Sequence, residues 1–243
     1  MNQANLAFKS VKRLDEGRIA LLLVLPTLII LVGLAVYPLG WAGAIAFRVE
    51  NLFRPDIGHW IGFRNFKYLL TEDTFWKSIR LTLIWCLSVV SIQMVLGFLL
   101  AMMLDTRARV VGVLRTLIVI PVFISPIAMG LTWQFMFEPV TGVINYFLEI
   151  AGLPEGSWHT STDTALIAVM IADIWQWTPF VTLILLAGMQ GISPEVIEAA
   201  RLDRVRGWQY IRRIMIPLIW PVVMIVLLLR VVDSIRVFDL IYI

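Results

Sequence analysis

A short charged segment between two long apolar stretches carries residue types that suit contact with another protein. Residues 198–203 read Glu-Ala-Ala-Arg-Leu-Asp, and Ile-Met-Ile-Pro follows at 214–217. The two alanines predict a flat patch that another backbone can approach closely, flanked by charges that can pair with a partner. The predicted contact residues are Glu198, Ala199, Ala200, Arg201, Asp203 and Gly207. The alternative is an amphipathic helix that only lies on lipid headgroups.

The local sequence predicts a short helix at the start of this segment. Ser193 is expected as the N-cap, with Pro194 at the first helical position and Glu195 in the first turn, where an acid meets the helix dipole. Gly207 is expected to break the chain before a second short helix, Trp208 to Arg213. That second helix leads into the next apolar stretch.

Polar residues within apolar stretches mark a second candidate site, because such groups are costly in lipid and usually face a cavity. Asp173, Gln176, Trp177 and Phe180 have the spacing i, i+3, i+4 and i+7, so they share one helix face. An aromatic ring beside an amide suits a sugar, whose ring offers an apolar face and hydroxyl groups. Gln93, in the middle of another apolar stretch, is the fifth predicted residue of this substrate pathway.

Packing alone is the alternative explanation for these residues. Asp173 would then hold a structural hydrogen bond and Gln93 an interhelical one, while the tryptophans would contact neighbouring helices. Arg230 and Asp233 lie one helical turn apart, which predicts an intrahelical pair or snorkelling toward the membrane surface. Pro179 removes a helical hydrogen-bond donor near the same depth as the polar face.

The sequence predicts neither a metal site nor a phosphate-binding loop. His59 and His159 stand alone, without metal-ligand spacing, and the chain has no G-x-x-x-x-G-K-[ST] motif. It also lacks an H-E-x-x-H pair and a placed Ser/His dyad. We therefore expect a protein that transports and does not catalyse, with no cofactor of its own.

The composition is that of a membrane protein. Of 243 residues, 60% are hydrophobic and 15% charged, and the mean hydropathy of +0.86 lies outside the range of ordinary soluble domains. The net charge of +3 could suggest nucleic acid, but Lys and Arg gather where the positive-inside rule puts them, so no nucleic-acid partner is expected. No repeat or linker divides residues 1–243, which predicts a single domain.

Five stretches are long enough to cross a hydrocarbon core of about 30 Å. They cover residues 19–47, 81–104, 110–137, 165–189 and 214–232. The predicted fold class is therefore all-α, a polytopic helical membrane protein. Ala44-Ile45-Ala46 is like a signal-peptidase site, but the apolar run before it is too long for a signal peptide, which favours a retained first span. Pro121 and Pro126 are expected to let the third span bend.

The distribution of Lys and Arg predicts the orientation. They gather before the first span, over 107–115 and over 201–213, which places the N-terminus and the charged segment in the cytoplasm. Residues 48–80 also carry positive charge, but their helical apolar spacing predicts an amphipathic pair of external helices. Five spans leave the apolar ending 238–243 outside, so we expect the chain to be C-terminally incomplete and a sixth span to follow.

The whole chain resembles the carbohydrate-type permeases of ATP-binding-cassette (ABC) importers, similar to those for maltodextrins and glycerol phosphate. The motifs that carry the resemblance are Gly62-Phe63-Arg64-Asn65-Phe66, Ile174-Trp175-Gln176-Trp177-Thr178-Pro179-Phe180, Glu198-Ala199-Ala200 with Ile214 to Pro217, and Arg236-Val237-Phe238-Asp239-Leu240-Ile241-Tyr242. In the family the Glu-Ala-Ala loop forms a coupling helix that sits in a cleft of the nucleotide-binding subunit. Two departures are Arg204, where the family usually has Gly, and Ile216-Pro217 in place of Leu-Pro.

The resemblance implies a permease subunit of a bacterial inner-membrane importer for a sugar or sugar-like solute. Residues 190–213 would be its cytoplasmic coupling loop, between the fourth and fifth spans. The implied partners are a second homologous permease, two nucleotide-binding subunits that bind ATP and Mg²⁺, and an extracytoplasmic solute-binding protein, besides membrane lipid. The alternative is a secondary transporter or channel, which would need ion-coupling carboxylates and usually an inverted repeat.

Overall fold

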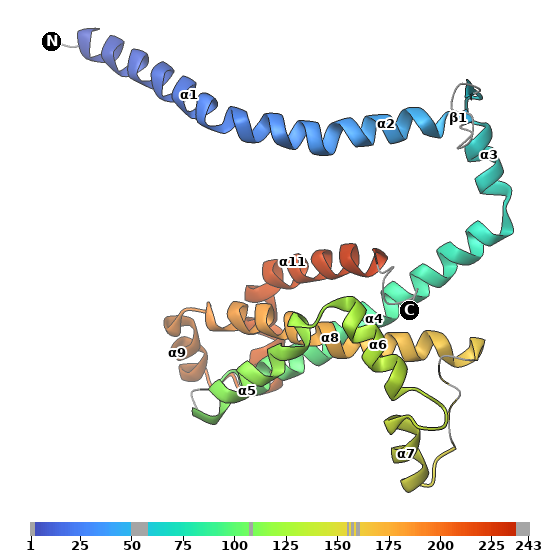
Figure 1. Cartoon of the computed structure of the whole chain (residues 1–243). Coiled ribbons are helices and arrows are strands. Elements are labelled where there is room, and N and C mark those ends of the chain that lie inside the picture. Colours follow the sequence, from blue (N-terminus) through green and yellow to red (C-terminus); the bar gives the residue numbers. More distant parts are fainter. Residues whose placement is uncertain are drawn as a thin grey trace. The chain divides into compact units, whose positions relative to one another are not determined.

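The computed structural model describes residues 3–49, 58–106, 109–154, 156, 158 and 161–236. The predictions for His159 and for residues 237–243, including the last family motif beyond Arg236, lie outside these residues. The sixth span stays a prediction. The chain divides into two compact units, Met1–Lys77 and Ser78–Ile243, which are described separately (Figure 1).

The first unit begins with a long apolar helix that contains one wide turn. Helix α1 (Gln3–Leu31), the π-helical turn η1 (Val32–Val36) and α2 (Tyr37–Ala46) follow one another directly. Gly17–Ala46 is long and apolar enough to cross a membrane, in agreement with the first predicted span. The π turn ends two residues before Pro38. In a regular helix the proline ring would clash with a carbonyl four residues earlier, and a wider turn relieves that clash.

A two-stranded hairpin and a short helix complete the first unit. Strand β1 (Arg48–Val49) pairs antiparallel with β2 (His59–Trp60), and α3 (Arg64–Thr71) follows. The second of the two predicted external helices is not separate. It is the beginning of α4 (Asp73–Leu104), which continues into the second predicted span because no proline interrupts it.

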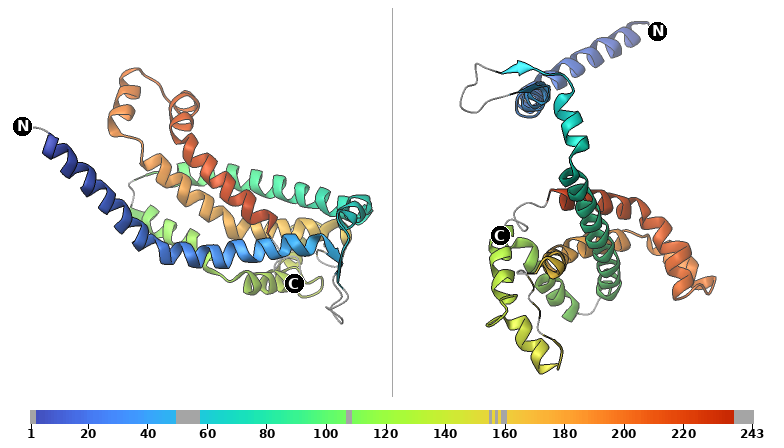
Figure 2. Two further views of the ribbon diagram at one scale, coloured as in Figure 1. Left: turned by 90° about the horizontal axis from the view of Figure 1, so that it is seen from above. Right: turned by 90° about the vertical axis from the view of Figure 1, so that its right-hand side faces the viewer.

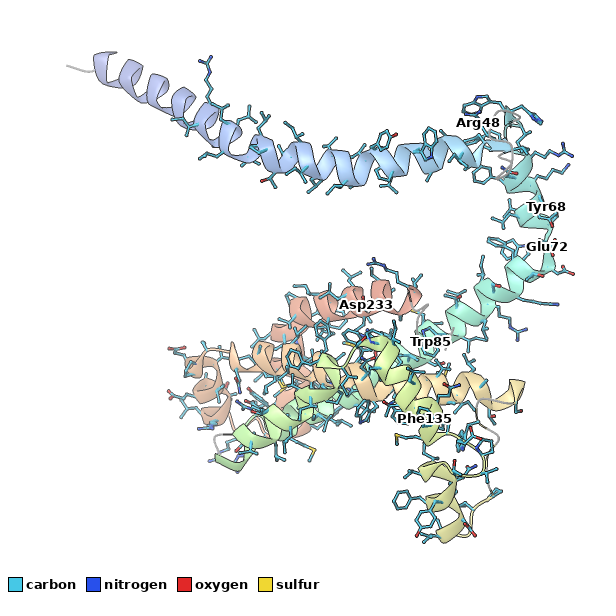
Figure 3. The ribbon with its side chains drawn as sticks, in the orientation of Figure 1. Arg48, Tyr68, Glu72, Trp85, Phe135 and Asp233 are labelled. Carbon is cyan, nitrogen blue, oxygen red and sulfur yellow. The ribbon has the colours of Figure 1, made fainter. Side chains whose placement is uncertain are left out.

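The first family motif, residues 62–66, joins α3 to the end of the first span. Gly62 has a φ of 56°, a left-handed conformation that favours glycine. The Asn65 side chain donates to the carbonyl oxygens of Ala46 at 2.9 Å and Arg48 at 3.0 Å. The rings of Phe47, Phe63 and Phe66 pack with centroids 5.2 to 5.9 Å apart. Figure 3 shows Arg48 at the hairpin, Tyr68 on α3 and Glu72 where the chain bends before α4.

Three long helices form the frame of the second unit. Helices α4, α8 (Thr162–Gln190) and α11 (Ile216–Ile235) lie side by side (Figures 1 and 2). Gly97 permits close approach of α4 and α8, because a Cβ there would lie 2.6 Å from Cγ1 of Val181 and 3.2 Å from a backbone nitrogen of α8. One buried apolar cluster comprises Ala101, Leu104, Val111, Val181, Leu185, Leu186, Met189, Met215, Ile219 and Val226.

The fifth predicted span begins earlier than expected. Helix α10 (Trp208–Tyr210), the π turn η4 (Ile211–Met215) and α11 are continuous, so the prediction of a separate short helix up to Arg213 is wrong. The π turn ends two residues before Pro217, as η1 does before Pro38. The wide turn accommodates the proline without ending the helix.

The third predicted span is broken sharply. Helix α5 (Arg109–Val119) and the 3-10 turn η3 (Ile120–Phe123) are followed, after two extended residues, by α6 (Pro126–Met136), with a bend of 96°. Pro126 explains the break, because the residue before a proline is pushed out of the helical region. Among the described residues, four helices are long and apolar enough to cross a membrane, or five if the bent pair is one span.

One buried asparagine, Asn145, joins several parts of the loop between α6 and α8 by hydrogen bonds. The loop contains α7 (Val143–Ile150), which lies at the opposite end of α8 from the charged segment (Figure 1). The Asn145 side chain donates to the carbonyls of Pro139 and Gly156 at 3.0 and 2.9 Å. It accepts from the backbone nitrogen of Gly156 at 3.1 Å and from Nε1 of Trp158 at 2.8 Å. All four hydrogen-bonding positions of this amide are used, which the sequence did not reveal.

Replacing Gly97 with Ala should destabilise the packing of α4 against α8. The added methyl group meets a side chain and a backbone atom that cannot both move away, and overpacking of this kind costs about 1 to 3 kcal/mol. Denaturant titration of the purified protein in detergent would measure the loss. Gly112→Ala in α5 is the matched control, since a Cβ there meets nothing within 4 Å. Equal stability of the two variants would contradict the close approach.

Candidate functional site

The predicted charged segment contains a helix, α9 (Pro194–Leu202), at the end of α8. Pro194 occupies the first turn, as predicted, and Ser193 precedes it with extended backbone. Ser193 is the N-cap residue, as predicted, but its side chain makes no capping hydrogen bond to the backbone of the helix. Hydrogen bonds from its own backbone N–H and from the Ser193 side chain lower the pKa of Glu195, which lies exposed in the first turn.

Helix α9 has an inner and an outer face. Val196, Ile197 and Ala200 are buried or half-buried, and Val196 borders a groove that α9 shares with α8 and α11. The outer face is exposed and has the spacing i, i+3, i+4 and i+7. Its members are Glu195, Glu198, Ala199 and Leu202.

This arrangement corrects the predicted patch of two alanines. Ala199 is exposed, but Ala200 is only 4% exposed and faces its own chain. The apolar residue that does lie outside is Leu202, which is 84% exposed. Arg201, Asp203 and Gly207 are exposed, as a contact surface requires.

The end of α9 explains why Ala200 turns inward. The backbone N–H of Arg204 donates to the carbonyl of Arg201 at 3.1 Å, and that of Val205 donates to the carbonyl of Ala200 at 2.9 Å. This pair of hydrogen bonds is the Schellman motif, which usually brings the two residues of the longer bond into apolar contact. Those positions are held here by the buried Ala200 and the half-buried Val205.

The motif needs a left-handed residue, and Arg204 supplies it with a φ of 56°. The family resemblance predicts Gly at this position, and Arg204 adopts the left-handed conformation that glycine favours. Gly207 has φ 54° and ψ −128° and precedes α10. It therefore breaks the chain as predicted, in a backbone conformation that essentially only glycine adopts.

The second candidate site contains a buried ion pair that joins three helices. Arg230 of α11 is only 1% exposed, and its Nη2 lies 3.0 Å from Oδ2 of Asp173 on α8. Its Nε donates to Oε1 of Gln93 on α4 at 2.9 Å. The Gln93 amide donates in turn to Oδ2 of Asp173 at 2.8 Å. Each of the three side chains thus bonds to the other two.

The sequence prediction for Arg230 missed its main partners. The predicted pair with Asp233 exists at 3.3 Å, but the Asp233 side chain is 48% exposed and the stronger contacts run to the other helices. The interhelical hydrogen bond considered for Gln93 is present. Close by, Nε1 of Trp85 on α4 donates to the carbonyl of Ser234 at 3.2 Å. Figure 3 shows Trp85 and Asp233 near one another in this part of the unit.

The Gln176 side chain forms a hydrogen bond to the backbone at the break in the third span. Its side-chain nitrogen donates to the carbonyl of Ile124 at 2.9 Å, at the extended turn between η3 and α6. A backbone carbonyl released at membrane depth must find a partner within the protein. Asp173, Gln176 and Gln93 therefore bond to protein groups and are buried, as the packing alternative describes. Their place in the substrate pathway stays a prediction.

Trp177 and Phe180 are the half-buried members of the predicted face. Their rings are T-shaped with centroids 6.0 Å apart, and the Arg230 guanidinium carbon lies 4.9 Å from the centre of the Trp177 ring. An arginine at this distance attracts the ring face electrostatically. Trp175 lies on the other side of α8, where it borders an apolar groove of ≈ 510 Å³ with Pro179. The network of Arg230, Asp173 and Gln93 thus contacts the aromatic pair Trp177 and Phe180 through the Arg230 guanidinium.

Replacing Arg230 with Met, or Asp173 with Asn, should destabilise the helix assembly strongly. Each single change leaves a buried polar or charged partner unpaired, which costs about 3 kcal/mol or more. Unfolding of the purified protein by denaturant would measure both losses, and the double variant should lose less than their sum. Asp233→Asn, at a partly exposed pair, should cost less than about 1 kcal/mol. Additive losses would show that the two buried residues are not coupled.

Comparison with known proteins agrees with this architecture. The family model described as "Binding-protein-dependent transport system inner membrane component" matches residues 93–243. The chain is 33% identical over 228 residues to the trehalose/maltose transport system permease protein MalF of Thermococcus litoralis, covering 94% of this chain and 77% of that protein. It is 31% identical over 231 residues to the trehalose transport system permease protein SugA of Mycobacterium tuberculosis, covering 95% and 74%.

A solved structure has the same fold. One chain in the crystal structure of a bacterial alginate ABC transporter, in complex with an alginate pentasaccharide-bound periplasmic protein, aligns with a TM-score of 0.75 and 25% identity. The alignment covers 90% of this chain and 73% of that one. Since the family model covers more than half of the chain and relatives align over nearly all of it, the chain belongs to the inner-membrane components of binding-protein-dependent transport systems, the multi-pass permease subunits of ABC importers.

Proposed function

We propose that this permease subunit imports a sugar or sugar-like solute and is driven by a separate ATPase that docks on α9. The observation that supports docking is the exposure of Glu198, Ala199 and Leu202 on the outer face of α9. A helix that only lay on anionic headgroups would not present two glutamates, Glu195 and Glu198, on its outer face. Family membership also favours this function over a secondary transporter or channel.

The proposal includes an orientation of the chain in the membrane and a set of partner subunits. The Lys and Arg residues before the first span and over 201–213 support a cytoplasmic N-terminus and a cytoplasmic α9. The membrane would be the bacterial cytoplasmic membrane. The complete importer would contain a second homologous permease, two nucleotide-binding subunits that hold ATP and Mg²⁺, and an extracytoplasmic solute-binding protein. The alginate transporter, solved with its periplasmic protein, supports such an assembly.

The aromatic pair supports a sugar as the transported solute. Trp177 and Phe180 offer half-buried ring faces, and aromatic rings pack against the apolar faces of sugar rings. Three buried residues would hold this surface in place. Asp173 and Gln93 bond to Arg230, and Gln176 bonds to the carbonyl of Ile124. The trehalose and maltose permeases among the relatives point to the same class of solute.

Replacing Trp177 with Ala should weaken sugar uptake by the complete importer. Loss of an aromatic stacking surface worth about 1 kcal/mol should raise the transport KM several-fold, while binding of the ATPase is unchanged. Uptake of radiolabelled trehalose or maltose into reconstituted vesicles would measure it. The matched control is Trp175→Ala, on the other side of α8. Equal KM values for both variants and the wild type would exclude Trp177 from the pathway.

Replacing Glu198 with Lys should uncouple the permease from its ATPase. Reversing a charge in a desolvated contact typically costs about 2 to 5 kcal/mol, enough to abolish substrate-stimulated ATP hydrolysis or to detach the ATPase. Co-purification and ATP hydrolysis in reconstituted membranes would report the effect. Arg206→Ala, an exposed change beyond the end of α9, serves as the control. Normal transport by Glu198→Lys with the ATPase still bound would remove α9 as the docking site.

A further inference from the structure

Helix α7 has an apolar face that no other part of the described chain covers. Four of its eight residues have the spacing i, i+3, i+4 and i+7, so they share one side of the helix, and each is 49 to 65% exposed. They are Val143, Tyr146, Phe147 and Ile150, which we call the α7 apolar face. Contiguous apolar side chains on a surface mark a site where a protein or a membrane binds.

The opposite side of α7 is held by its own loop. Asn145 is 5% exposed, and its side chain bonds to Pro139, Gly156 and Trp158. The Trp158 ring in turn packs on Phe137, at the end of α6, with ring centroids 5.3 Å apart. Because these contacts fix the rotation of α7 about its axis, the α7 apolar face points away from the loop.

The place of α7 in the fold indicates a membrane as the occupant of this face. The helix runs across the direction of α8, at the end of α8 opposite to α9, so it lies along a membrane surface (Figures 1 and 2). It follows α6, which belongs to the bent pair that can form one span. Phe135 of α6 is 75% exposed (Figure 3), and Val140, between α6 and α7, is 89% exposed. The α7 apolar face therefore continues an apolar surface that begins on a span.

The charge of the loop defines the kind of lipid. Residues 137–161 include Glu138, Glu149 and Glu155 but no Lys or Arg. Helices that are attracted to anionic lipids have cations on their polar side, and this loop has acids instead. Binding must then come from apolar side chains alone. The ring and hydroxyl of Tyr146 suit the border between lipid tails and headgroups, where one end of a side chain is apolar and the other wet.

We propose that α7 is an interfacial helix that anchors the α6–α8 loop to the membrane surface opposite α9. Its apolar face inserts among lipids with neutral headgroups. The contacts of Asn145 and Trp158 extend this anchoring to Phe137, so the membrane fixes the end of α6. The inference rests on membership in a family of membrane proteins and on the geometry of the loop. It does not depend on the proposed docking of the ATPase or on the proposed solute.

A nitroxide label attached to Phe147→Cys would measure the depth of the α7 apolar face. The experiment uses the complete permease assembly in phosphatidylcholine nanodiscs and electron paramagnetic resonance, with oxygen and a water-soluble nickel complex as collision agents. We expect the label to lie about 5 to 10 Å below the lipid phosphates. The matched control is Glu149→Cys, an exposed position outside the face, where the label should stay in water. The native Cys86 is buried, and unlabelled wild-type protein would verify that it does not react.

A second variant tests whether apolar side chains hold the helix in place. With the label on Ile150→Cys, the added change Phe147→Asp should move the label outward by about 5 Å, whereas Phe147→Leu should leave it in place. A label on Phe147→Cys that lies in water would overturn the inference. Shielding of this label from both collision agents, with or without the solute-binding protein, would assign the face to a protein partner and also overturn it. Deeper insertion in phosphatidylglycerol than in phosphatidylcholine would contradict the neutral-headgroup chemistry.

Discussion

The buried ion pair between Arg230 and Asp173, completed by Gln93, is the interaction on which the second unit depends. It joins α11, α8 and α4 where apolar packing alone would allow the helices to slide, because lipid tails are as apolar as the helix surfaces. Buried polar side chains must find partners within the protein, and because these three bond to one another they fix which faces of the three helices meet. The same guanidinium lies over Trp177, and the structural network therefore also positions the ring that we propose meets the solute.

The need to satisfy every backbone group in a membrane also explains the irregular turns. Pro38 and Pro217 each follow a π turn by two residues, and in both places the helix continues through the proline. At Ile124 the chain instead leaves the helix, and Gln176 supplies the missing donor. Pro126 thus breaks its span where the side chain of Gln176 can satisfy the carbonyl of Ile124.

The connection between α8 and α11 is shaped by a different interaction, the hydrogen bonds that end α9. A Schellman motif turns Ala200 inward and leaves Glu198, Ala199 and Leu202 outward. For the docking that we propose, rigidity at this point would matter, because a movement of the ATPase would reach α8 and α11 only through a segment that does not absorb it. The left-handed Arg204 is part of this rigid turn.

The sequence by itself determined the features that depend on local chemistry. Apolar length predicted four helices that can cross a membrane and the bent pair of α5 and α6. Pro194 predicted the start of α9, Gly207 the break after it, and Pro126 the bend in the third span. The tertiary structure decided which side chains meet: that Arg230 reaches Asp173 and Gln93, that Gln176 serves Ile124, and that Ala200 is buried. Helical spacing tells which residues share a face, but the direction of that face depends on which helices lie beside it. Which helices are neighbours is set by contacts between residues 52 to 137 positions apart, and no local pattern records such contacts.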